Sequence, residues 1–140
     1  MKTLFVYTDG GARGNPGPAG IGVIIKSETG MLLKKIFRRI GETTNNTAEY
    51  MAVVQALTYI KEAKHDVKLN HYRQFKFHLD SAVVVNQLNG LYKVKEAHLR
   101  ELLLKVRILE QELGGIITYK QIPRLQNCEA DKLVNEALDS

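Results

Sequence analysis

Residues 4–11 read LFVYTDGG, an apolar run that ends in a carboxylate, Asp9, followed by two glycines. Apolar runs rich in aromatic and β-branched residues are typical of buried strands, so this run predicts a strand that ends at Asp9. Residues 10–18 contain four glycines and two prolines, and they predict a turn-rich loop. Two further strands, at residues 21–26 and 31–40, predict an antiparallel meander with the first.

The rest of the chain alternates helical and strand patterns. Residues 48–64 repeat apolar residues at three- and four-residue steps, which predicts a helix, and residues 75–79 alternate apolar with polar residues, which predicts a strand ending at Asp80. The remaining expected elements are a short helix capped by Ser81, a long amphipathic helix at residues 95–113, a strand at residues 116–122 and a last helix with Asn127 at its N-cap.

This order of elements predicts an α/β fold with a mixed five-stranded sheet, three antiparallel strands followed by two parallel ones, flanked by helices. A chain of 140 residues fits a single domain, residues 1–140. The one cysteine, Cys128, excludes an internal disulfide and is interpreted as a small semi-buried side chain. The apolar runs are too short for a membrane span or a signal sequence, so we expect a cytoplasmic protein without a membrane partner.

The charge balance is basic. Twenty Lys and Arg residues against fifteen Asp and Glu residues give a formal net charge of +5. Such a surplus attracts polyanions, nucleic acid first, although many proteins carry one without binding DNA or RNA. The position of the acidic residues is more informative than their number.

Four acidic residues stand where elements begin or end. Asp9 and Asp80 close two expected strands, and their carboxylates would emerge at the same edge of the sheet if those strands are neighbours. Glu49 and Asp131 lie in the expected first turns of two helices, where an isolated acid more often serves the helix dipole. Four acids in one place would repel one another unless cations neutralise them. Ligands that are all oxygens suit a hard divalent ion such as Mg²⁺, and two such ions about 4 Å apart could activate water and stabilise a leaving oxygen.

Four blocks of the sequence closely resemble the type 1 ribonucleases H, also called ribonucleases HI. The blocks occur in the order of that family and span nearly the whole chain: YTDGG with GNPGPAG at residues 7–11 and 14–20, TTNNTAE at residues 43–49, DS at residues 80–81 and NCEAD at residues 127–131. The resemblance implies the ribonuclease H fold. It also implies an endoribonuclease that hydrolyses the RNA strand of RNA/DNA hybrids with two Mg²⁺ ions, Mn²⁺ being a possible substitute, and leaves 5′-phosphate and 3′-hydroxyl ends.

The resemblance assigns roles by position. Asp9 would bridge both ions, Asp131 would help to hold the ion that activates water, and Glu49 and Asp80 would help to hold the other. The residues implied to bind the hybrid are Gly10, Gly11, Asn15, Thr44, Asn45 and Asn46. Among these, the glycines permit close approach of the backbone to a ligand, the three asparagines would lie near the 2′-hydroxyls of the RNA, and Thr44 would lie near a phosphate of the DNA strand.

The chain departs from the pattern of the family at two places. Many members carry a His on the loop before the last carboxylate; residues 122–127 contain none, and Arg124 is a possible auxiliary residue that cannot act as a general base at neutral pH. Well-studied bacterial members also have a basic, Trp-containing protrusion. This chain has no Trp, and residues 90–94 are too few to hold the protrusion, so the resemblance is to a short form. The basic residues left to supply affinity are Lys93, Lys95, Arg100 and Lys105.

Two alternatives remain open from the sequence. One is a catalytically silent module of the same fold that binds hybrids or RNA, and the presence of all four acids argues against it. The other is a DNA nuclease of this fold, similar to a resolvase or a transposase, because one fold hosts many activities. No obligatory protein partner is evident. The choice of Mg²⁺ or Mn²⁺, the cleavage preference, the cellular task and the oligomeric state are not predicted.

Overall fold

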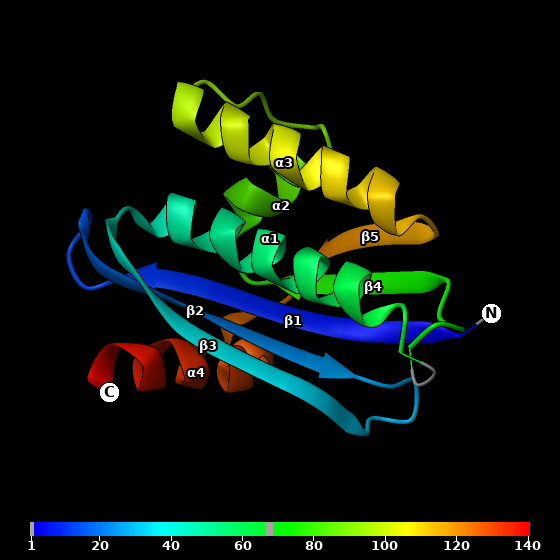
Figure 1. Cartoon of the computed structure of the whole chain (residues 1–140). Helices are drawn as coiled ribbons and strands as arrows, with labels where there is room; N and C mark the ends of the chain where they lie inside the picture. The colour runs from blue at the N-terminus through cyan, green and yellow to red at the C-terminus, as the bar shows by residue number, and fades with distance from the viewer. Residues whose placement is uncertain (1, 67–68) are drawn as a thin grey trace.

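The computed structural model describes residues 2–66 and 69–140 and shows a sheet covered by helices on both faces (Figure 1). The elements follow the expected order, with one short 3-10 helix, η1, before the last helix. They are β1 (Thr3–Ala12), β2 (Gly17–Lys26), β3 (Leu32–Thr43), α1 (Asn45–Ala63), β4 (Gln74–Leu79), α2 (Ala82–Leu88), α3 (Ala97–Leu113), β5 (Ile116–Gln121), η1 (Arg124–Asn127) and α4 (Cys128–Asp139).

The sheet has the order β3-β2-β1-β4-β5, with β1 at its centre. Strands β1, β2 and β3 pair antiparallel, whereas β4 is parallel to β1 and β5 is parallel to β4. The prediction of three antiparallel strands followed by two parallel ones is therefore confirmed. The parallel pairing of β1 with β4 ends at Tyr7 opposite His78, while the pairing of β1 with β2 continues to Ala12. The sheet thus narrows on the β4 side of β1, directly beside Asp9.

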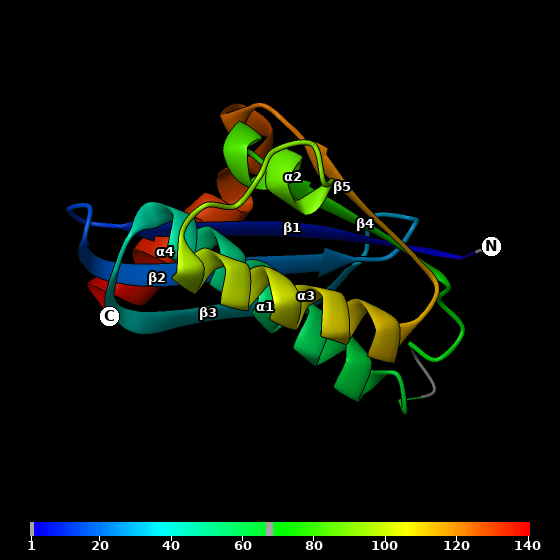
Figure 2. The same cartoon turned by 90° about the horizontal axis from the view of Figure 1, so that it is seen from above.

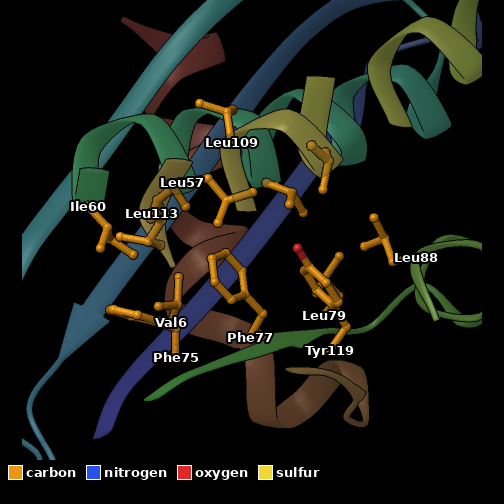
Figure 3. Packing of buried hydrophobic residues seen from close by; sticks show 14 of the residues in the cluster. Val6, Leu57, Ile60, Phe75, Phe77, Leu79, Leu88, Leu109, Leu113 and Tyr119 are labelled. Atoms are coloured by element: carbon orange, nitrogen blue, oxygen red, sulfur yellow. The ribbon is translucent and has the colours of Figure 1, made fainter. Parts of the chain in front are cut away.

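Helices α1 and α3 cover one face of the sheet, and α4 covers the other (Figures 1 and 2). Helix α1 lies between β1 and α3, so it buries residues on two sides; Ala52 and Ala56 belong to the expected stripe, and Val53 and Leu57 extend it. The main core fills the space between these helices and the sheet. Figure 3 shows members of that core from the sheet and from helices α1 and α3, among them Val6, Leu57, Phe77, Leu79, Leu109 and Leu113.

Two predicted loops are shorter than expected. Strand β1 continues through Gly10 and Gly11 to Ala12, so Asp9 lies inside the strand rather than at its end, and the loop contains only residues 13–16. The glycines were misleading because Gly10 serves packing instead of a turn: a Cβ there would lie 2.3 Å from the carbonyl oxygen of Ala48 in α1. Helix α1 therefore rests on the backbone of β1.

The second correction concerns the start of α1. The expected strand ended at residue 40 and the expected helix began at residue 48, whereas β3 runs to Thr43 and α1 begins at Asn45, so Thr44 alone connects them. Thr44 is the N-cap, and its side chain accepts a hydrogen bond from Thr47 N. Because the helix starts earlier than predicted, Glu49 lies in its second turn rather than its first.

Three smaller points concern the remaining expectations. Cys128 is exposed, so its interpretation as a semi-buried side chain is wrong. Residues 89–96 alone connect α2 to α3, in agreement with the short form. Within residues 2–66 and 69–140, none of the helices has the length and hydropathy that crossing a membrane requires.

Candidate active site

Three of the four predicted carboxylates meet at the edge where the sheet narrows. One oxygen each from Asp9, Glu49 and Asp80 lies within 4.8 Å of the other two. Asp9 comes from the central strand, and Asp80 directly follows the neighbouring parallel strand β4, so the expectation that both emerge together is confirmed. Glu49 comes from α1, where its Oε1 accepts a hydrogen bond from Gly10 N at 2.7 Å.

Asp131 approaches the same place from the other face of the sheet. It lies in the first turn of α4, as predicted, and lines one cleft with Asp9, Glu49 and Asp80. The close approach of α4 depends on Gly22, which pairs with Asp9 across β1 and β2. A Cβ at Gly22 would lie 2.3 Å from the carbonyl oxygen of Ala130. The cleft has a volume of about 430 Å³.

The electrostatics of the cluster disfavour ionisation of its buried members. Burial raises the pKa of Asp9 to about 7; a hydrogen bond with Glu49 opposes this shift, and the charges of Asp80 and Asp131 add to it. Burial also raises the pKa of Glu49 well above its usual value, and the neighbouring Asp9 adds to that shift. At neutral pH, the buried pair of Asp9 and Glu49 therefore either retains a proton or needs a positive charge nearby in order to ionise fully.

The donor set fits a divalent cation. Glu49 Oε2 is buried and receives no hydrogen bond from a donor group among the described residues. Two ionised carboxylates have only acceptor atoms, so Asp9 and Glu49 cannot satisfy each other unless they share a proton. A hard cation would satisfy both, and oxygen-only ligands are those that Mg²⁺ and Mn²⁺ prefer.

One residue of the site was given a different role by the sequence. Asn127 occupies the expected N-cap position of α4, but its side chain makes no capping hydrogen bond. The side chain is buried instead, and its Nδ2 donates to Thr8 O at 2.9 Å and to Asp80 Oδ2 at 3.3 Å. Asn127 thus joins α4 to β1 and to a carboxylate of the cluster. Its membership of the fourth resembling block was the signal that could have revealed this role.

Four of the six residues expected to bind substrate line the cleft, and the other two lie next to them. Gly10, Gly11, Asn45 and Asn46 line it. Asn15 lies beside them, since its Oδ1 accepts from Asn45 N at 2.9 Å, and Asn45 Oδ1 in turn accepts from Ala12 N at 2.8 Å. Thr44 caps α1 next to this group without lining the cleft.

Among the described residues, two cationic side chains also line the cleft. Arg124, the expected auxiliary residue, reaches it from η1. Arg13 reaches it from the loop between β1 and β2, and sequence reasoning missed it. A cation inside a glycine-rich loop was the only signal available for Arg13.

The chain is similar to known proteins over nearly its whole length. The profile of the family described as "Reverse transcriptase-like" matches residues 7–137. Among curated proteins, the chain is 37% identical to the ribonuclease HI of Halobacterium salinarum over 138 residues, which cover 97% of this chain and 64% of that protein. It is also 36% identical to a bifunctional protein of Mycobacterium tuberculosis, over all of this chain and 36% of that protein. The chain thus spans between about a third and two thirds of these relatives.

Three solved structures match this chain over nearly their whole length. LC11-RNase H1, isolated from compost, superposes with a TM-score of 0.90 at 45% identity over 99% of this chain and 97% of that chain. The same protein in complex with an RNA/DNA hybrid gives a TM-score of 0.89. The RNase H1 of Halobacterium salinarum gives 0.86 at 35% identity, covering 98% of each chain. With its five-stranded sheet, its carboxylate cluster and these matches, the chain belongs to the type 1 ribonuclease H family.

Proposed function

We propose that this chain is an endoribonuclease that hydrolyses the RNA strand of RNA/DNA hybrids. The observation that carries the proposal is the cluster of Asp9, Glu49 and Asp80, in which one oxygen of each lies within 4.8 Å of the other two, in a cleft that Asp131 also lines. A module that only binds nucleic acid would gain nothing from buried negative charge beside phosphates. The choice of hybrid as substrate is supported by the hybrid complex of LC11-RNase H1, a protein 45% identical to this chain.

The proposed cofactor is Mg²⁺, with two ions in the catalytic complex and Mn²⁺ as a possible substitute. Asp9, Glu49, Asp80 and Asp131 would hold these ions. When bound, the ions would supply an activated water and would stabilise the charge that develops on the phosphate and on the leaving oxygen. The products would be a 5′-phosphate and a 3′-hydroxyl.

The chain contributes orientation to this chemistry. Asn127 fixes one oxygen of Asp80, and Gly10 N fixes one oxygen of Glu49, so two of the four carboxylates have a set direction before any ion binds. Ligands that are held by hydrogen bonds need less reorganisation on binding a metal. Arg124 is proposed as an auxiliary residue that stabilises negative charge at the edge of the cleft.

The proposed hybrid-binding surface consists of six residues that line the cleft or lie next to it: Gly10, Gly11, Asn15, Thr44, Asn45 and Asn46. Amide groups can donate to or accept from a 2′-hydroxyl, which is the group that distinguishes RNA from DNA. A cytoplasmic location, a single domain at residues 1–140 and the lack of an obligatory protein partner belong to the same proposal.

The test compares three labelled duplexes of one sequence: an RNA/DNA hybrid, an RNA duplex and a DNA duplex, each with Mg²⁺ and with EDTA. We expect cleavage of the RNA strand of the hybrid with Mg²⁺ only. Efficient cutting of the DNA duplex would favour the DNA nuclease. Metal-independent binding without cleavage would favour the silent module, and the Asp9→Asn variant controls for contaminating nuclease.

A further inference from the structure

The loop between β1 and β2 holds Arg13 in a defined position. Arg13 N donates to Pro18 O at 2.8 Å and closes the loop. The loop is also tied to the start of α1, because Asn15 Oδ1 accepts from Asn45 N. The backbone of Arg13 is therefore anchored beside residues that line the cleft, whereas its side chain can change its interaction partner.

The side chain of Arg13 points to the C-terminal end of α4. One guanidinium nitrogen lies 2.6 Å from Asp139 Oδ1, and another donates to Asn135 Oδ1 at 3.3 Å. Figure 1 shows the end of α4 at the same end of the sheet as the β1–β2 turn. The pair is exposed: the side chains of Arg13 and Asp139 keep 47% and 65% of their accessible surface. Asp139 thus neutralises the charge of Arg13, a residue that lines the cleft.

This ion pair is easily exchanged. A pair between two exposed side chains contributes little to folding stability, because water screens the charges and the side chains lose freedom. A guanidinium can donate two parallel hydrogen bonds to a phosphate, and such charge-assisted pairs are among the stronger hydrogen bonds. A phosphate that enters the cleft can therefore replace Asp139 as the partner of Arg13.

We propose that Arg13 binds a backbone phosphate of the bound hybrid, and that Asp139 holds Arg13 in the free protein and competes with that phosphate. This inference rests on the proposed function, since it needs a hybrid in the cleft. Arg13 is then a substrate-binding residue outside the set that the sequence indicated. Asp139 tunes affinity without touching the substrate.

The test is a double-variant cycle on hybrid affinity, measured by fluorescence anisotropy in the inactive Asp9→Asn background at several salt concentrations. Arg13→Gln should weaken binding by about tenfold and reduce the salt slope by about one counterion. Asp139→Asn should tighten binding by several-fold. In the Arg13→Gln background, Asp139→Asn should have only the effect of removing a distant charge.

A matched control isolates that distant effect. Glu136→Gln removes the same charge from the same exposed face of α4, where no contact with Arg13 exists among the described residues. In the presence of Arg13, Asp139→Asn must increase hybrid affinity more than Glu136→Gln does. In the Arg13→Gln background, the two substitutions must change hybrid affinity equally. Arg13→Lys keeps the positive charge but loses the two parallel donors of the guanidinium, so it should recover part of the affinity that Arg13→Gln loses. This recovery would show that the loss in Arg13→Gln is not caused by misfolding.

The cleavage kinetics separate this inference from the proposed function. In the otherwise unmodified enzyme, Arg13→Gln should raise KM for the hybrid and leave kcat nearly unchanged. A parent that does not cleave the hybrid would overturn the proposed function itself. A parent that cleaves, with Asp139→Asn indistinguishable from Glu136→Gln, would overturn only the role of Arg13 and Asp139.

Discussion

Asn127 donates from one nitrogen to two acceptors of the site, the Thr8 carbonyl at 2.9 Å and Asp80 Oδ2 at 3.3 Å. Thr8 lies in β1, and Asp80 directly follows the neighbouring parallel strand β4. Asn127 stands four residues before Asp131, which lies in the first turn of α4. One buried side chain therefore sets the position of Asp80 and of the start of α4. This relationship makes Asn127 a positioning residue for the metal ligands.

The first prediction follows from that relationship. Asn127→Ala should lower hybrid cleavage by about 10- to 100-fold, the range typical of groups that orient a metal ligand. The loss should be accompanied by a higher Mg²⁺ concentration for half-maximal activity, because Asp80 loses its donor. Metal titrations of kcat measure both effects. Asn86→Ala, which removes a side-chain amide that donates to Ala82 O within α2, is the control and should match the parent. An unchanged Mg²⁺ requirement in Asn127→Ala would contradict the positioning role.

The second prediction concerns Asp9. Asp9→Asn keeps the size of the side chain but removes the charge from the centre of the cluster, so cleavage should fall by roughly 100-fold or more. Binding of the hybrid should persist, since the phosphate contacts are untouched. Single-turnover cleavage and anisotropy binding separate the two effects. Activity within a few-fold of the parent would contradict the proposed site.

The third prediction is the pH dependence of the metal-free protein. The pKa of Asp9 is about 7 in the folded state against 3.8 as its ordinary value, so the folded state binds this proton more tightly than the unfolded state. The contribution of Asp9 is therefore most favourable below pH 4, and it is lost as the pH rises from about 4 to 7. In EDTA, the thermal midpoint of the parent should fall relative to that of Asp9→Asn as the pH rises across this window. Added Mg²⁺ should restore the midpoint of the parent but not change that of Asp9→Asn. Parallel pH profiles of the two proteins would contradict the prediction.

The fourth prediction tests why glycine follows Asp9. Gly10→Ala would place a Cβ 2.3 Å from the backbone of Ala48, so α1 must shift and the protein should lose about 1–3 kcal/mol of unfolding free energy. Gly11→Ala is the matched control, because its Cβ would meet only a side-chain carbon of Val134 at 3.8 Å, an ordinary contact. Urea unfolding measures both. Equal stabilities of the two variants would contradict the packing role of Gly10.

The spacing of apolar residues predicted the order of helices and strands, because the spacing within each element reflects which of its faces is buried. The convergence of Asp9 and Asp80 followed from the same information, since parallel neighbours bring their ends to one edge. The glycines after Asp9 were misread as a loop, because the sequence does not distinguish a glycine that allows a helix to pack closely from a glycine that forms a turn. The partners of Asn127 and Arg13 lie far away along the chain, and no local pattern indicates them.

The last prediction concerns Asn45, whose two amide atoms have separable roles. Its Oδ1 accepts from Ala12 N and so ties α1 to β1, while its Nδ2 donates no hydrogen bond within residues 2–66 and 69–140. Asn45→Asp keeps the acceptor and removes the donor. The thermal midpoint should therefore stay near that of the parent, whereas Asn45→Ala should lower it.

If Nδ2 of Asn45 contacts a 2′-hydroxyl of the RNA, Asn45→Asp should weaken hybrid binding by about tenfold in the Asp9→Asn background. Negative charge alone would also weaken binding, and a second change distinguishes the two causes. Replacing the contacted ribonucleotide by a deoxyribonucleotide should weaken hybrid binding by the parent but should add little to the loss in Asn45→Asp, because both changes remove the same hydrogen bond. A set of hybrids with one deoxyribonucleotide at each position in turn locates the contact. Additive losses at every position would show that Asn45→Asp acts through its charge, and that the 2′-hydroxyls are read by another residue.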